Sequence, residues 1–147
     1  MTGAVFVDTN VLVHSRDASE PGKQPVAASW LRRLWEERAG RLSSQVLHEY
    51  YVTVTERLDP GLDQEVARAD VRSLLVWRPI ALDAGILEGA WAVQDRHRLS
   101  FWDSLIVSAA QVGGCKYLLT EDLQDGQDLD GLEVVDPFRR SPDTILG

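Results

Sequence analysis

The chain has 147 residues, of which 44% are hydrophobic and 26% are charged, so we expect one globular domain with a substantial core. Its net charge of −8 argues against a protein that holds nucleic acid through a broad basic surface. No apolar run is long enough to cross a membrane, and the first twenty residues lack the basic segment of a signal peptide. Because the single cysteine, Cys115, has no internal disulfide partner, we expect a cytoplasmic protein.

In the first half of the chain, short apolar strands alternate with amphipathic helices. A strand is expected at 4–7, followed by a short helix over 10–14 and a polar loop over 15–24. Pro25 favours a first helical turn, and we expect this helix to stop at Gly40. The next expected elements are a very short strand at Leu42–Ser43, a helix from the cap Ser44 through Val54, a turn at 59–61, and a helix from about Asp63 to Leu75.

The second half of the chain continues the alternation. An extended piece at 79–82 precedes a helix that Asp83 caps. Ser100 begins an apolar helix that ends at Gly113–Gly114, strands follow at 116–119 and 132–135, and residues from about 137 to 147 form an irregular tail. The alternation predicts a single α/β domain over 1–147 with a mostly parallel sheet. In such sheets, ligands gather beyond the carboxyl ends of the strands.

Four carboxylates lie where the chain changes direction or within a helix: Asp8, Glu49, Asp103 and Asp122. Asp8 and Asp122 each follow an apolar strand, so both occupy the edge of the sheet where ligands gather. Asp103 interrupts an almost wholly apolar helix. A globular domain rarely buries acids that are neither paired nor bound to a cation. If the four acids converge, they need a hard divalent metal ion to offset their mutual repulsion.

Two of these acids also have local structural explanations. Asp8-Thr9-Asn10 can form an Asx turn that starts a helix, or Asp8 can bind a metal ion while Thr9 and Asn10 orient it. Ser100 and Asp103 have the spacing of a capping box, which usually faces solvent. The apolar neighbours of Asp103 instead indicate a helix that is buried on most sides.

The other two acids are similarly open to a structural explanation. Glu49 can be a solvated helical side chain, and Asp122 can cap a turn, with Thr120 donating to a carboxylate, a phosphate or the same turn. Residues 121–136 contain seven acids and no Lys or Arg. We expect most of this segment to be a solvated loop, in which only Asp122 and Asp125 lie near a strand end.

Other site motifs are absent from the sequence. There is no Walker loop, dinucleotide fingerprint or serine-nucleophile elbow, and the three histidines lack a shared metal-ligand spacing. The five tryptophans are more typical of core or subunit contacts than of base stacking.

Four segments together resemble the PIN-domain ribonucleases, and most closely the VapC-type toxins: residues 6–12, the helix that carries Glu49, residues 100–106 and residues 118–126. They occur in the family order and span most of the chain. The Trp-Asp-Ser-Leu-Ile and Thr-Glu-Asp-Leu-Gln-Asp-Gly segments are specific signals, whereas Glu49 is placed mainly by its order in the chain.

The resemblance implies a three-layer α/β/α fold and an endoribonuclease that depends on Mg²⁺ or Mn²⁺. In that reading Asp8 and Asp103 contact the principal metal ion directly, while Glu49 and Asp122 act directly, through water or through a second metal ion. Residues placed around them are Thr9, Asn10, Thr120 and Asp125. The resemblance also implies an RNA substrate, a homodimer and an antitoxin whose tail places a basic side chain among the acids.

Two alternatives remain open. In a phosphatase of the haloacid-dehalogenase type, Asp8 would be a covalent nucleophile, but that motif requires a second acid where this chain has Asn10. In the other, a degenerate PIN domain acts only as a binding partner.

Overall fold

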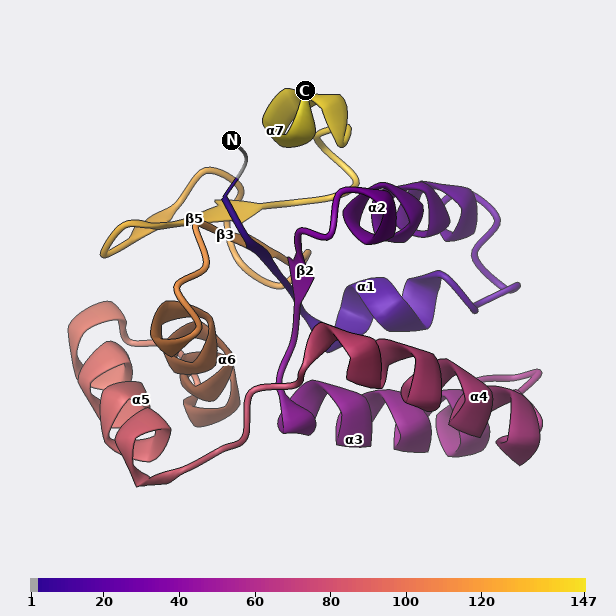
Figure 1. Cartoon of the computed structure of the whole chain (residues 1–147), viewed down its shortest axis with the longest axis horizontal. Helices are drawn as coiled ribbons and strands as arrows, with labels where there is room; N and C mark the ends of the chain where they lie inside the picture. Colours follow the sequence, from indigo (N-terminus) through magenta and orange to yellow (C-terminus); the bar gives the residue numbers. More distant parts are fainter. Residues whose placement is uncertain (1–2) are drawn as a thin grey trace.

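The computed structural model describes residues 3–147 and places five short strands in one sheet (Figure 1). The strands are β1 (Val5–Val7), β2 (Gly40–Arg41), β3 (Tyr117–Leu119), β4 (Asp128–Leu129) and β5 (Leu132–Val135). Their order is β2-β1-β3-β5-β4, and every pairing is parallel except that of β4 with β5. The predicted mostly parallel sheet is therefore confirmed.

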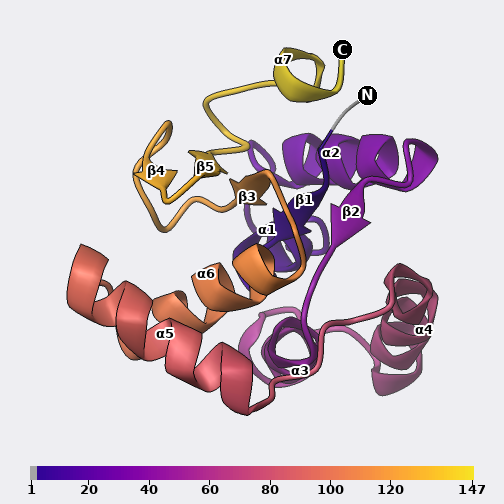
Figure 2. The ribbon, with the colours of Figure 1, turned by 60° about the vertical axis from the view of Figure 1, so that its left-hand side comes forward.

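Helices cover both faces of this sheet and give the three-layer α/β/α fold (Figures 1 and 2). The helices are α1 (Thr9–His14), α2 (Gln24–Glu36), α3 (Ser44–Val52), α4 (Gln64–Leu74), α5 (Ala84–His97), α6 (Phe101–Val112) and α7 (Asp143–Leu146). A π-helical turn over Thr53–Arg57 extends α3, and a 3₁₀ turn over Leu75–Trp77 follows α4. Helices α5 and α6 lie together on one side, whereas α1 and α2 lie on the other. Among the described residues, no helix has the length and apolar character to span a membrane.

The core is built on the central strands and on α6. All three residues of β1 are buried, and α6 is buried from Ser104 to Ala110, so the apolar sequence of this helix reflects cover from the sheet and from α5. Helices α5 and α6 approach closely where Gly89 faces Ser108. There the Ser108 hydroxyl donates a buried 2.8 Å hydrogen bond to the carbonyl oxygen of Ile86.

Capping explains where several helices begin. The Asp83 carboxylate accepts a 2.9 Å bond from the backbone N–H of Ile86, which confirms the predicted N-cap of α5. Ser100 caps α6 in the same way, through a 3.1 Å bond from the N–H of Asp103. The predicted starts of these helices are therefore right for the expected physical reason.

The structure differs from the sequence prediction around Gly40. Helix α2 ends at Glu36, and Gly40 lies in β2 rather than stopping the helix. The chain reverses through Arg38, whose φ is 55°, a conformation that a sequence rarely signals when the residue is not glycine. The predicted strand at 42–43 is shifted, although Ser43 forms an isolated parallel bridge with Ile80, in the predicted extended piece.

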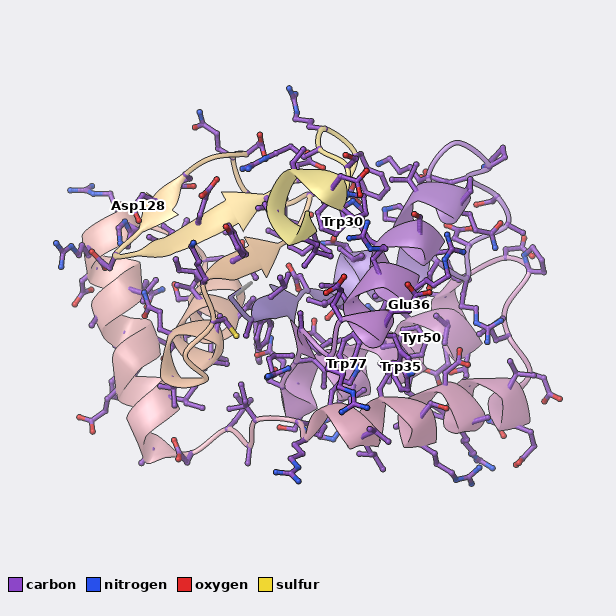
Figure 3. All side chains as sticks on the ribbon, turned by 45° about the horizontal axis from the view of Figure 1, so that its top comes forward. Trp30, Trp35, Glu36, Tyr50, Trp77 and Asp128 are labelled. Carbon is purple, nitrogen blue, oxygen red and sulfur yellow. The ribbon has the colours of Figure 1, made fainter. Side chains whose placement is uncertain are left out.

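The C-terminal segment is more ordered than the predicted irregular tail. It contains α7, and the Trp30 indole N–H donates to the carbonyl oxygens of Pro137 and Arg140, both at 3.1 Å (Figure 3). Arg33 also pairs with Asp143 at 2.5 Å. These contacts fasten the end of the chain to α2.

Candidate active site

The pairing of β1 with β3 brings two of the predicted acids to one edge of the sheet. Val7 is opposite Leu119 in the parallel register, and the backbone N–H of Asp8 donates a 3.0 Å bond to the carbonyl oxygen of Leu119. Because both strands end here, Asp8 and the segment beginning at Thr120 leave the sheet side by side. This is the position at which parallel sheets bind ligands.

The Asp8 carboxylate is 7% exposed and is held by three donors. Its Oδ1 accepts a 2.7 Å bond from the N–H of Thr9, so Asp8 is also the N-cap of α1. Its Oδ2 accepts a 2.8 Å bond from the Thr120 hydroxyl and a 3.2 Å bond from the Asn10 amide. The prediction that Asp8 starts a helix is thus correct, although Oδ1 accepts from the adjacent N–H and not from the N–H two residues on that an Asx turn uses, while Oδ2 faces a polar cluster.

The Asn10 amide nitrogen lies among three oxygens from different parts of the chain. It is 3.2 Å from Asp8 Oδ2, 3.0 Å from Thr120 Oγ1 and 3.1 Å from Asp122 Oδ2. An amide nitrogen carries only two hydrogens, so it cannot donate a full hydrogen bond to all three. Two carboxylates and a hydroxyl therefore converge on one point, and hard oxygen donors of this kind suit Mg²⁺ or Mn²⁺.

Burial and the charges of neighbouring acids disfavour the charged forms of Asp8 and Asp103. The pKa of Asp8 is raised from 3.8 to about 7, chiefly by burial and further by the charges of Asp122 and Asp103, against the stabilising bonds from Thr120 and Thr9. The pKa of Asp103 is also raised, first by burial and then by Asp122, while its bond with Ser100 opposes the shift. A cation between the acids would reverse these effects because it favours the carboxylate form.

Helix α6 positions Asp103 in its first turn. Its backbone N–H donates to the capping hydroxyl of Ser100, and the charge of its half-buried side chain contributes to the raised pKa of Asp8. The capping and site interpretations of Asp103 are therefore compatible. Trp102, which was expected in a mostly buried helix, is instead 63% exposed.

Glu49 lies apart from the other three acids. It is exposed on α3 and lines a cavity of about 410 Å³ with Gln45, His48, Leu82 and Trp102. Trp102 directly precedes Asp103, so this cavity adjoins the start of α6. No hydrogen bond or ion pair within residues 3–147 joins Glu49 to the other acids, and no three His, Cys, Asp or Glu side chains there are arranged around a metal position.

Asp125 is directed toward the C-terminal segment. Its Oδ1 accepts bonds from the backbone N–H of Asp136 at 2.9 Å and from Arg140 Nε at 3.0 Å. These bonds lower the pKa of Asp125. The structure therefore gives this carboxylate a structural contact, which secures the end of the chain.

Sequence reasoning missed the role of Glu121. Its carboxylate contacts His14 Nε2 at 2.5 Å and Lys23 Nζ at 2.7 Å, and its backbone N–H donates to Asn10 Oδ1 at 3.4 Å. These bonds fix the loop after β3 against α1 and the start of α2. The adjacent strand end was the only available signal, because His14 and Lys23 are distant in sequence.

The geometry does not favour a haloacid-dehalogenase-type phosphatase. Asn10 occupies the position of the second acid that this chemistry needs. The chain has two lysines, of which Lys23 is paired with Glu121 and Lys116 precedes β3, at the other end of the strand.

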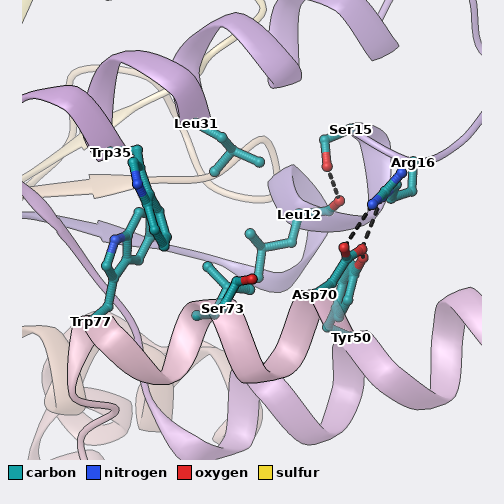
Figure 4. A pocket seen from close by; sticks show the side chains of 10 residues that line it. Leu12, Ser15, Arg16, Leu31, Trp35, Tyr50, Asp70, Ser73 and Trp77 are labelled. Atoms are coloured by element: carbon teal, nitrogen blue, oxygen red, sulfur yellow. Dashed lines mark hydrogen bonds and ion pairs between the residues drawn. The ribbon is translucent and has the colours of Figure 1, made fainter. Parts of the chain in front are cut away.

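A separate cavity of about 200 Å³ lies between α1, α2, α3 and α4 (Figure 4). Arg16 there binds Asp70 through two bonds of 2.6 and 2.9 Å, and the Tyr50 hydroxyl donates to the same carboxylate at 2.5 Å. None of the four predicted acids lines this cavity, so it is separate from the candidate active site.

Comparison with known proteins shows which family and which solved structures the chain is similar to. The PIN domain family model matches residues 5–130, whereas no curated protein matches the sequence. The structure of Mycobacterium tuberculosis VapC20, a sarcin–ricin-loop-cleaving toxin, aligns with a TM-score of 0.60 and 26% identity, covering 78% of this chain and 87% of that one.

Two further solved structures share the fold. A chain of a toxin–antitoxin complex from Klebsiella pneumoniae aligns with a TM-score of 0.59 and 20% identity, covering 91% of this chain and 97% of that one. A chain of VapBC2 from Rickettsia felis, bound to a DNA fragment from its promoter, aligns with a TM-score of 0.60 and 17% identity, covering 90% and 99%.

Proposed function

The chain belongs to the PIN-domain family, and from this premise we propose that it is a metal-dependent endoribonuclease acting as the toxin of a toxin–antitoxin pair. The observation that carries the proposal is the convergence of Asp8 and Asp122 on the Asn10 amide, with Asp103 close enough to raise the pKa of Asp8. The fold shared with VapC20, a sarcin–ricin-loop-cleaving toxin, gives further support.

The residues at the sheet edge have separable roles in this proposal. Asp8 and Asp103 would hold Mg²⁺ or Mn²⁺ directly, with Asp122 and Glu49 acting directly or through water. When bound, the ion polarises the scissile phosphate and lowers the pKa of a water molecule. Thr120 and the Thr9 N–H orient the Asp8 carboxylate, which keeps one oxygen turned toward Asp122.

The charge of the protein supports a requirement for metal ions. A molecule with a net charge of −8 repels the phosphates of RNA, and the acids at the sheet edge concentrate that repulsion at the site. A divalent ion offsets both the carboxylates and the substrate phosphate. RNA cleavage should therefore require the ion, whereas removing one acid, as in Asp8→Asn, itself lessens the repulsion that opposes RNA binding.

The proposal includes an antitoxin and a second copy of the chain as partners. The related folds from Klebsiella pneumoniae and Rickettsia felis belong to toxin–antitoxin complexes, which supports an antitoxin here. A basic side chain of the antitoxin would be attracted by Asp8, Asp103 and Asp122, and would compete with the metal ion for them. The proposed site of action is the cytoplasm.

The test is cleavage of single-stranded and looped RNA by purified protein freed from antitoxin. Cleavage is expected with Mg²⁺ or Mn²⁺ and not with EDTA. Asp8→Asn and Asp103→Asn should each reduce it more than about a hundredfold, since loss of even an outer contact to a metal site costs 10–100-fold. The exposed Asp128, on β4, provides the control Asp128→Asn, which should cut normally.

Circular dichroism would establish that each variant is folded. Normal cleavage by folded Asp8→Asn or Asp103→Asn would show that the assigned acids are wrong. If the wild type binds RNA but does not cut it with either metal ion, the binding-only alternative is correct.

A further inference from the structure

The cavity beside Glu49 combines an indole, a leucine and polar side chains in its lining, which consists of Gln45, His48, Glu49, Leu82 and Trp102. Its volume of about 410 Å³ lies within the usual range of ligand pockets. Gln45 and Glu49 are one helical turn apart on the same face of α3, and Trp102, in the first turn of α6, lines the same cavity. The cavity is therefore continuous with the chain segment that carries Asp103.

Trp102 leaves a large aromatic surface in solvent. Its side chain is 63% exposed, and it meets Phe101 in a T-shaped contact with ring centroids 5.3 Å apart. Much of the indole is therefore available to a ligand. The core position predicted as one alternative does not explain this exposure, whereas aromatic faces beside single-stranded nucleic acid commonly stack on bases.

Gln45 supplies an independent observation. The residue is only 7% exposed, and its buried Oε1 has no hydrogen-bond partner among residues 3–147. A buried polar atom without a partner is unfavourable and calls for an explanation. The terminal amide torsion has a broad energy minimum, so rotation can present either the oxygen or the nitrogen to the cavity.

We propose that this cavity binds one unpaired nucleobase of the RNA substrate, stacked on Trp102 and hydrogen-bonded along its edge by the Gln45 amide. Glu49 gives the cavity an acceptor for the amino group of a base. A base offers a flat face and an edge of donors and acceptors together, which matches both features. The inference rests on the proposed function, and the bound base would position the RNA at the candidate active site.

The first experiment measures RNA binding in an Asp8→Asn background, which prevents cleavage, in the presence of Mg²⁺. The probes are fluorescein-labelled eight-nucleotide homopolymers of A, C, G and U. Trp102→Ala should raise the Kd for the preferred homopolymer about tenfold, because stacking of one base on an aromatic ring strengthens binding by roughly that factor. Trp102→Phe should recover most of the affinity.

The matched control is Trp91→Ala, since Trp91 is also an exposed indole but lies on α5 outside the cavity. It should leave the Kd unchanged. In otherwise wild-type protein, Trp102→Ala should raise KM for cleavage more than it lowers kcat. A base that is bound equally well before and during the reaction contributes to KM.

Gln45→Leu separates binding from structure. Leucine has a similar volume and removes the unpaired amide, so the Tm should stay unchanged or rise. RNA affinity should nevertheless fall several-fold, and the preference among the four homopolymers should become weaker. A purely structural Gln45 would leave both the Kd and the preference unaltered.

The outcomes distinguish the base site from the nuclease assignment. If the wild type cleaves RNA but Trp102→Ala and Gln45→Leu bind it normally, the base site is wrong and the proposed function stands. If Trp102→Ala changes only the oligomeric state in size-exclusion chromatography, Trp102 is a subunit contact and the inference fails. Protein that shows Trp102-dependent binding without cleavage supports the base site and rejects the nuclease; protein that neither binds nor cleaves RNA rejects both.

Discussion

Cys115 illustrates how burial controls a single side chain. The residue follows α6 and is 9% exposed, and burial raises the pKa of its thiol from 9.0 to about 11, partly opposed by the charge of Arg41. Only the thiolate reacts with alkylating agents. At pH 8 we expect iodoacetamide to modify the native protein at least about a hundredfold more slowly than the urea-unfolded protein, since two pKa units change the thiolate population by that factor.

Mass spectrometry of samples quenched at intervals measures this rate. Because the folded thiol titrates near pH 11, the native rate should continue to rise with pH through 9 and 10, about tenfold per unit while the fold persists. A rate for native Cys115 equal to that of the unfolded chain would show that the thiol is open to solvent.

The candidate site could be predicted from sequence only where strand ends define it. Asp8 and Thr120 follow strands that pair in parallel, so their proximity follows from the fold class. The central position of the Asn10 amide depends on a turn of α1 and on rotamers that no pattern encodes. Asp125 is similar to Asp122 in sequence context, yet Arg140 binds it because the tail folds back.

At the scale of elements, Gly40 is required by packing between β2 and the turn after α4. A Cβ at this position would lie within 2.6 Å of Trp77 Cζ2 and Cζ3. Trp77 is itself fixed against Trp35, with ring centroids 5.6 Å apart (Figure 3). We therefore expect Gly40→Ala to lower the free energy of unfolding by about 1–3 kcal/mol through overpacking.

Urea unfolding followed by circular dichroism measures this change. Gly22→Ala is the matched control, because a Cβ there meets nothing within 4 Å and the residue has an ordinary backbone conformation. It should be neutral or stabilise by less than about 1 kcal/mol. Equal stability of Gly40→Ala and the wild type would mean that Trp77 can move aside without cost.

Elements with local signals were predictable, and those set by tertiary contacts were not. The caps Asp83 and Ser100 mark α5 and α6 correctly because capping is local. The predicted end of α2 was wrong because Gly40 is needed to make room for the Trp77 ring and does not terminate the helix. Strand β4 was missed, although Asp130-Gly131 is a hairpin signal and both residues have positive φ.

At the scale of the whole molecule, the fold gathers acidic side chains although the chain is already negatively charged. The parallel sheet brings acids to one edge, while the chain already carries a net charge of −8. The bonds from Arg140 to Asp125 and Glu133 offset part of the acidic segment after β3. Asp8, Asp103 and Asp122 have no ion-pair partner among the described residues, so the repulsion between them destabilises the native state.

A ligand that relieves this repulsion in the native state alone should raise the stability of the whole domain. Mg²⁺ or Mn²⁺ at a hundred times its Kd would add about 2.7 kcal/mol to the free energy of unfolding. For a domain of this size that corresponds to a rise in Tm of roughly 5–10 °C. Differential scanning calorimetry of the antitoxin-free protein measures it, with NaCl at equal ionic strength as the reference.

The same measurement on Asp8→Asn tests where the ion binds. Removing one carboxylate relieves repulsion, so the metal-free variant should be at least as stable as the metal-free wild type, while its response to Mg²⁺ should be lost. Asp128→Asn should keep the full response, because Asp128 lies on β4 away from the site. An equal Tm rise in wild type and Asp8→Asn would place the stabilising ion elsewhere on the acidic surface and would remove the metal ion from the proposed chemistry.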